Sequence, residues 1–161
     1  MEKYKWKIIL INLLIILVFF NISVFKKEKI ISDGKLILLK LAPKDPRSLM
    51  QGDYMILRYL IASNIDISNL STRGYIVVNI KSNNLANRVR IQKNSSPLNE
   101  DEYLIKYFLK STGISIGAES FFFQEGKAKI FEKAKYGGIK VDDSGNSLVI
   151  GLYDKDFKKI K

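Results

Sequence analysis

The sequence predicts an α+β protein: one N-terminal transmembrane helix, then a mainly antiparallel β-sheet domain of about six or seven strands with one amphipathic helix. An uncharged apolar run fills residues 8–25. Short runs rich in β-branched and aromatic residues follow, separated by turn residues, as is typical of sheets. Near residues 127–136 the apolar spacing changes to that of a helix. We therefore divide the 161-residue chain into a basic tail and anchor at 1–25, a charged linker at 26–33 and one domain at 34–161.

The apolar run has the length of a membrane span. Its 18 residues carry no charge. As a helix rising about 1.5 Å per residue they would extend roughly 27 Å, close to the hydrocarbon thickness of a bilayer. Tyr4 and Trp6 take interface positions, and lysines stand on both sides. A signal peptide would have an apolar region of about 7–15 residues before small residues, and the sequence at 21–25 is a poor cleavage site. We expect an uncleaved anchor rather than a signal peptide or a buried core helix.

The lysines around this run are balanced between its two ends. Three precede it and three follow it, so the positive-inside rule scarcely discriminates between the two orientations. They are Lys3, Lys5, Lys7, Lys26, Lys27 and Lys29. The tail before the run is only seven residues long. An ordinary signal anchor keeps such a tail in the cytoplasm and exports the large C-terminal part, and we expect that topology.

Composition excludes several kinds of site. The chain has no cysteine and no histidine, which rules out disulfides, a thiol nucleophile, thiolate metal sites and a Ser-His-Asp triad within the chain. We expect no cofactor and no metal, although oxygen-ligand sites for magnesium or calcium stay open. The net charge of +11 can draw a domain to anionic surfaces; a solvated, lysine-rich surface is the simpler interpretation. The sequence has neither a basic helix nor an alternation of aromatic and basic residues, so we expect no nucleic-acid binding.

The first part of the domain predicts two strands around a rigid corner. Residues 35–41 are apolar apart from lysines and form the first strand, which Pro43 and Pro46 end. A single helical turn at 47–51 and a Gly-Asp turn follow. Aromatic and aliphatic residues at 54–61 predict the second strand.

The rest of the domain alternates strands with turns and contains one helix. The expected elements are a loop at 62–74, strands at 75–80, 88–91 and 103–109, a helix at 127–136, and a closing hairpin of 139–141 with 148–153. Gly137 and Gly138 would end the helix, since glycine is a common C-terminal stop. The three phenylalanines at 121–123 are mostly core. Consecutive strand residues cannot all point inward, so one ring would face lipid or a partner.

A motif between the first two predicted strands resembles a known family. Residues 52–59 read Gly-Asp-Tyr-Met-Ile-Leu-Arg-Tyr and fit the pattern Gly-Asp-Tyr-x-x-Leu-x-Tyr. With the preceding residues 41–51, they resemble the GDYXXLXY family of bacterial membrane-anchored proteins. Residues 122–126 before the predicted helix, the glycine-containing hairpin near the end and the leading anchor are similar to that family too. The resemblance implies the bacterial cytoplasmic membrane and a multi-span membrane protein as partner; it implies no reaction.

The candidate site lies at this corner. Its residues are Asp45, Arg47, Asp53, Tyr54, Tyr59 and Glu125. One interpretation is structural: Asp45 caps a turn, Arg47 pairs with a carboxylate such as Asp53, and the tyrosines pack with satisfied hydroxyls. The other is a recognition surface in which Arg47 binds a partner's carboxylate or a lipid phosphate through two hydrogen bonds. On an ideal strand Tyr54 and Tyr59 point to opposite sides.

Three functions follow as expectations. The first is a membrane-anchored extracytoplasmic accessory, scaffold or recognition protein, not an enzyme, acting with a multi-span membrane protein. The second is a membrane-bound hydrolase resembling Ser-Lys signal peptidases, with Ser48 as nucleophile and Lys81 or Lys106 as base. The Ser-Met-x-Pro arrangement that is characteristic of those peptidases is missing from this sequence. The third is a sensor of anionic lipid or another anionic ligand.

Overall fold

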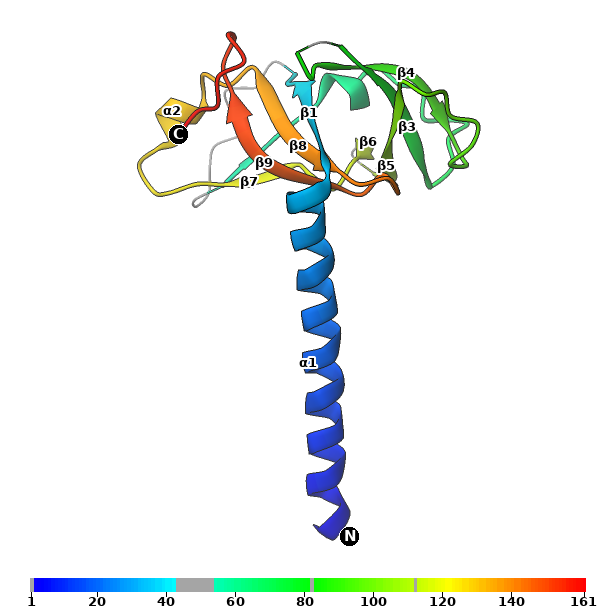
Figure 1. Cartoon of the computed structure of the whole chain (residues 1–161), viewed down its shortest axis with the longest axis vertical. Helices are drawn as coiled ribbons and strands as arrows, with labels where there is room; N and C mark the ends of the chain where they lie inside the picture. The colour runs from blue at the N-terminus through cyan, green and yellow to red at the C-terminus, as the bar shows by residue number, and fades with distance from the viewer. Residues whose placement is uncertain (1, 43–53, 82, 112) are drawn as a thin grey trace.

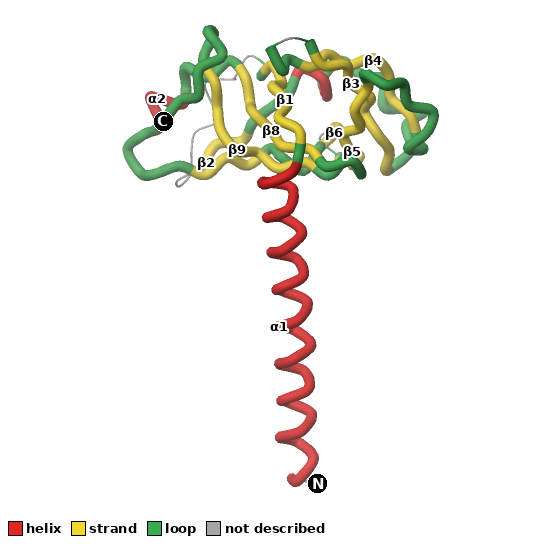
Figure 2. Tube along the Cα trace, in the orientation of Figure 1, coloured by secondary structure: helices red, strands yellow, loops and turns green. Residues whose placement is uncertain are grey.

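The computed structural model describes residues 2–42, 54–81, 83–111 and 113–161. It consists of a long N-terminal helix that stands as a stem below a β-rich head (Figure 1). Figure 2 shows that strands and loops make up almost all of the head. Within the described residues the head contains nine strands. The predicted α+β class, with an apolar helix followed by antiparallel sheet, is confirmed.

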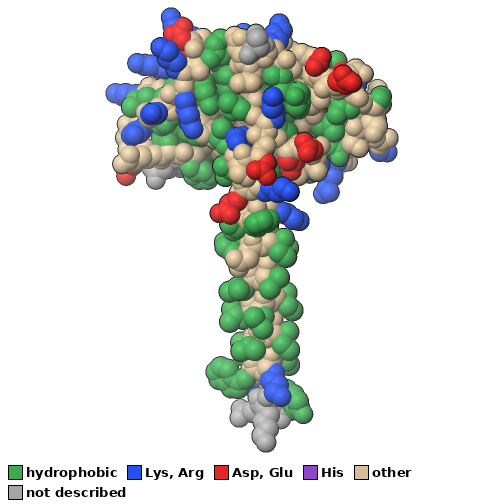
Figure 3. Space-filling model, in the orientation of Figure 1, with side chains coloured by type: hydrophobic (Ala, Val, Ile, Leu, Met, Phe, Trp, Pro, Cys, Tyr) green, Lys and Arg blue, Asp and Glu red, His purple; other side chains and the backbone are tan. Residues whose placement is uncertain are grey.

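Helix α1 (Glu2–Asp33) is apolar on all sides along residues 8–25. Hydrophobic side chains cover the visible face and both edges of the stem in Figure 3. Its apolar part buries none of its residues against the head, and among the described helices it is the one long and apolar enough to cross a membrane. A signal sequence near the N-terminus meets the same criteria of length and composition.

The segment 26–33, predicted as a linker, is instead the last part of α1. This segment contains neither glycine nor proline, the residues that most disfavour a helix, and its lysines and glutamate have high helix propensity. Ile30 is buried under the head. Gly34 then donates its N–H to the Ile30 carbonyl at 3.1 Å, and a Cβ at this position would collide with the same carbonyl oxygen. Lys140 Nζ donates to the Ser32 carbonyl at 3.0 Å. The helix therefore joins the head directly, without a loop.

Three antiparallel sheets form the head. The first has the order β1-β8-β9, with β1 (Lys35–Lys40), β8 (Tyr136–Val141) and β9 (Ser147–Tyr153). The second has the order β4-β3-β5-β6, with β3 (Arg73–Ile80), β4 (Ala86–Gln92), β5 (Glu102–Lys110) and β6 (Gly113–Ser115). The third pairs β2 (Tyr54–Ile56) with β7 (Ser120–Phe122). Leu38 of β1 links the first two sheets, since its N–H donates to the Asn84 carbonyl at 2.7 Å.

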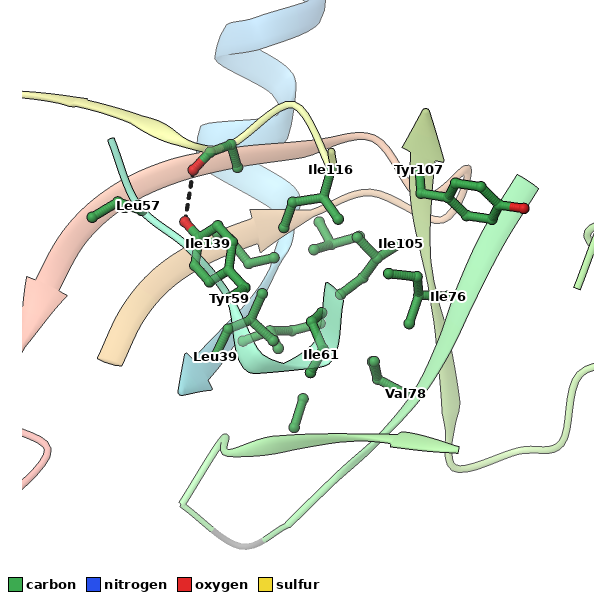
Figure 4. Packing of buried hydrophobic residues seen from close by; sticks show 14 of the residues in the cluster. Leu39, Leu57, Tyr59, Ile61, Ile76, Val78, Ile105, Tyr107, Ile116 and Ile139 are labelled. Carbon is green, nitrogen blue, oxygen red and sulfur yellow. Dashed lines mark hydrogen bonds between the residues drawn. The ribbon is translucent and has the colours of Figure 1, made fainter. Parts of the chain in front are cut away.

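One hydrophobic core lies between the sheets (Figure 4). The β1-β8-β9 sheet contributes Ile37, Leu39, Ile139 and Leu152, and the larger sheet contributes Ile76, Val78, Ile105 and Tyr107. Leu57, Tyr59, Ile61 and Ile116 fill the space between them. The core thus depends on the segment that carries the sequence motif.

Several predicted elements differ from the structure. The second strand ends at Ile56, and a short 3-10 helix, η1 (Leu60–Ala62), follows it. The predicted helix at 127–136 is reduced to α2 (Ala128–Phe131). Strands β6 and β7 were not predicted, because three residues are too few to show an alternation. The strands expected at 75–80, 88–91 and 103–109 are present and slightly longer.

The two glycines predicted to end a helix lie inside β8. A Cβ on Gly137 would be 2.7 Å from Cε1 of Tyr59, and one on Gly138 would collide with the ring of Tyr153. Both glycines are needed because aromatic rings cover the strand at these positions. The prediction of a helix stop was therefore wrong.

Candidate functional site

The structure separates the predicted site residues that it describes. Asp45, Arg47 and Asp53, together with the alternative nucleophile Ser48, lie outside the described residues. Tyr54 is exposed on β2, and Tyr59 is buried in the core. Glu125 is exposed in the turn before α2. These three side chains therefore do not form one cluster.

Tyr59 is a structural anchor of the motif. It is only 3% exposed, and its hydroxyl donates to the Ala118 carbonyl at 2.6 Å (Figure 4). Nearby, the Leu57 N–H donates to the Glu119 carbonyl at 2.7 Å. Burial raises the pKa of Tyr59 far above its ordinary value, and the negative charge of Glu119 adds to the rise. The hydroxyl stays protonated and holds the segment before β7 against the core.

The carboxylate of Glu119 organises the same segment. It accepts hydrogen bonds from Ser115 Oγ at 3.0 Å and from the Ile116 N–H at 2.5 Å. Ser147 Oγ donates to the Ile116 carbonyl at 2.8 Å and ties the segment to β9. No pattern in the sequence pointed to Glu119. Its role depends on backbone groups that the fold brings to it.

The outer face of the two-stranded sheet is apolar. We call it the β2–β7 apolar face; its apolar side chains are Tyr54, Ile56 and Phe122, which are 37%, 58% and 72% exposed, and the exposed Ser120 lies opposite Ile56. The rings of Tyr54 and Phe122 lie 5.6 Å apart between centroids. The opposite face of the sheet carries Met55 and Phe121, which pack with the core. Tyr54 and Tyr59 thus face opposite sides, and Phe122 is the exposed ring predicted within 121–123.

The two lysines considered as hydrolase bases are not buried in the core. Lys81 is exposed. Lys106 is half-buried, and its Nζ donates to Asn146 Oδ1 at 2.8 Å. The lysine base of a Ser-Lys hydrolase is a buried side chain, and neither Lys81 nor Lys106 is buried. Among the residues that the structure describes, no group of three or more Asp or Glu side chains is placed to hold a metal ion.

An ion pair that the sequence did not indicate stabilises the second sheet. Arg90 on β4 makes two bonds to the Glu102 carboxylate on β5, one of them from Nη2 to Oε2 at 2.8 Å. Arg90 Nη2 also donates to the Pro97 carbonyl at 2.8 Å, and the Asn99 N–H donates to Glu102 Oε2 at 3.0 Å. Hydrogen bonds from Arg90, and then from the Asn99 N–H, lower the pKa of Glu102 to about 2. The pair fixes the loop between β4 and β5 and has a structural role.

Acidification is expected to remove the stability that this pair provides. Because folding lowers the pKa of Glu102 from 4.5 to about 2, the unfolded chain binds the proton more readily than the folded one. The contribution is complete above pH 4.5 and is lost as the pH falls toward 2. Urea unfolding in detergent, followed by the near-ultraviolet circular dichroism of tyrosine, measures this for the wild type and Glu102→Gln. The wild type should be more stable at pH 7, and the difference should shrink below pH 4.5; a constant difference would contradict the pairing.

Comparison with known proteins agrees with the motif. The family model described as GDYXXLXY protein matches residues 16–152, which include part of α1 and nearly all of the head. No curated protein and no solved structure matches the chain. In the part of the motif that the structure describes, Leu57 and Tyr59 are core residues and Tyr54 is a surface residue. The chain belongs to the GDYXXLXY protein family.

Proposed function

We propose that this protein is a membrane-anchored, extracytoplasmic accessory protein that recognises and supports a multi-span membrane protein. The observation that carries the proposal is the stem. The apolar part of α1 buries none of its residues against the head, and its apolar side chains are exposed on every side. Such a surface is suited to lipid and to other membrane helices.

The head supports a role in binding rather than in catalysis. The motif residues Leu57 and Tyr59 are buried in the core. The β2–β7 apolar face lies on the surface of the head, where it is available for contacts. The topology that we propose places the short N-terminal tail in the cytoplasm and the head outside the cytoplasmic membrane of a bacterial cell.

A polar side chain within the span favours a helical partner. Asn21 Nδ2 donates to the Leu17 carbonyl of its own helix at 2.8 Å. Asn12 has no such bond within the described part of the chain, and its neighbours are apolar. An amide in the hydrocarbon region commonly bonds to a neighbouring helix. We propose that Asn12 contacts the partner's membrane helix.

Co-purification tests this function. The tagged full-length chain should retain a multi-span protein after extraction in mild detergent and chemical cross-linking. Asn12→Leu should weaken retention roughly 3–30-fold, since a hydrogen bond between membrane helices contributes about 0.6–2 kcal/mol. Asn21→Leu is the matched control and should leave retention unchanged. A wild-type chain that runs alone in several mild detergents would contradict the proposal.

A further inference from the structure

We infer that the β2–β7 apolar face rests on the lipid interface of the membrane that α1 crosses. The face presents Tyr54, Ile56 and Phe122. Its contact in this inference is the surface of the lipid bilayer rather than another protein. The inference rests on the membrane anchor proposed above. It adds a second, peripheral contact between the head and the same membrane.

The face lies on the membrane side of the head. Strands β2 and β7 run along the lower edge of the head, at the level where α1 joins it (Figures 1 and 2). In Figure 4 the segment leading to β7 also lies on the same side of the core as α1. Because Met55 and Phe121 pack with the core, the outer side chains point away from it. The apolar face is therefore turned toward the stem side.

The junction holds the head close to the bilayer. The apolar run ends at Phe25, and the helix continues to Asp33. These last eight residues of α1 extend about 12 Å at about 1.5 Å per residue, while the headgroup region on each side is about 5–8 Å thick. A usual helix tilt of about 20° lowers one side of the head further. The bonds at Gly34 and Lys140 leave no loop through which the head can move away.

The chemistry of the face fits an interface. Tyrosine places a ring in the apolar region and its hydroxyl among polar headgroups, which is why it is enriched at membrane surfaces. Phe122 and Ile56 are apolar, and the three side chains form one uncharged surface around the paired rings. Lys26, Lys27 and Lys29 lie exposed on α1 just below the head, where they suit anionic headgroups.

Depth-dependent quenching by brominated lipids tests the inference on the full chain. The protein is reconstituted in phosphatidylcholine–phosphatidylglycerol vesicles containing lipids brominated near the headgroup end of their acyl chains. Trp6 is the single tryptophan and reports insertion of α1. In a Trp6→Phe background, Phe122→Trp reports the apolar face, and Val89→Trp, 51% exposed on β4, is the matched control. Circular dichroism confirms that each variant is folded.

The expected result is quenching of the Phe122→Trp indole to an extent comparable with Trp6, and none for Val89→Trp. Ile56→Trp in the same background should behave like Phe122→Trp, and it serves if Phe122→Trp does not fold. Quenching of Trp6 without quenching at positions 122 and 56 overturns the inference and leaves the anchor intact. A blue-shifted but unquenched indole overturns it in favour of a protein contact. Quenching at position 89 equal to that at position 122 would show that the quenching is non-specific and would overturn the inference. An unquenched Trp6 would overturn the proposed membrane anchor as well.

Discussion

Replacing Tyr59 with alanine is expected to lower the free energy of unfolding of the head by about 3–5 kcal/mol, the usual cost of truncating a buried aromatic residue. The ring fills the space between the sheets, and its hydroxyl bonds to the Ala118 carbonyl. Tyr54→Ala is the matched control within the same motif. Because Tyr54 lies on the outer face, its loss should cost no more than about 1 kcal/mol, the value of its pairing with Phe122.

Tyr59→Phe separates the hydroxyl from the ring. It keeps the packing but leaves the Ala118 carbonyl without its donor, which should cost about 1–3 kcal/mol. Urea unfolding of the full chain in detergent, followed by tyrosine circular dichroism, measures all three variants. Equal losses for Tyr59→Ala and Tyr54→Ala would contradict the role of Tyr59 as the anchor of the motif.

Gly137→Ala is the second substitution with a large expected effect. The new methyl group would meet Cε1 of Tyr59 at 2.7 Å, and overpacking of this kind costs about 1–3 kcal/mol. In a Tyr59→Ala background the methyl group has room, so the cost should largely disappear. The double-mutant cycle should therefore give a coupling of about 0.5–3 kcal/mol.

Gly138→Ala is the control for this cycle. Its methyl group would collide with Tyr153 rather than Tyr59. It should therefore destabilise the head by a similar amount in both backgrounds. Two outcomes would show that the Tyr59 ring is not the reason for glycine at position 137. One is a coupling between Gly138 and Tyr59 as strong as that between Gly137 and Tyr59, and the other is no coupling at Gly137.

Long, uniform patterns in the sequence predicted the fold well. The uncharged run within α1, the β-branched run of β3 and the aromatic and aliphatic run of β5 correspond to the structure, because each element buries or exposes whole faces. Gly137 and Gly138 were misinterpreted because a helix end and a ring-covered strand both select glycine. The deciding partner of Gly137, Tyr59, is distant in sequence. The charges at 26–33 suggested a linker, but charge alone does not interrupt a helix.

The candidate site was predictable only in part. Tyr54 and Tyr59 lie on opposite sides as expected, although β2 ends at Ile56 and Tyr59 lies just beyond it, before η1. Glu119 and the Arg90–Glu102 pair could not be predicted, since their partners come from other strands or from backbone groups. Glu125 lies exposed in the turn before α2, which is only four residues long.

The direct junction between α1 and β1 also fixes the rotational orientation of the head about the helix axis. Each residue of an α-helix turns the chain by about 100°, and α1 continues without a break from Asn12 to Asp33. The direction in which Asn12 points from the helix axis is therefore locked to the direction in which the β2–β7 apolar face points on the head. A partner bound along one side of the helix always meets the same side of the head. The protein contact that we propose at Asn12 and the lipid contact that we infer for the head therefore keep a set angle to each other around the helix axis.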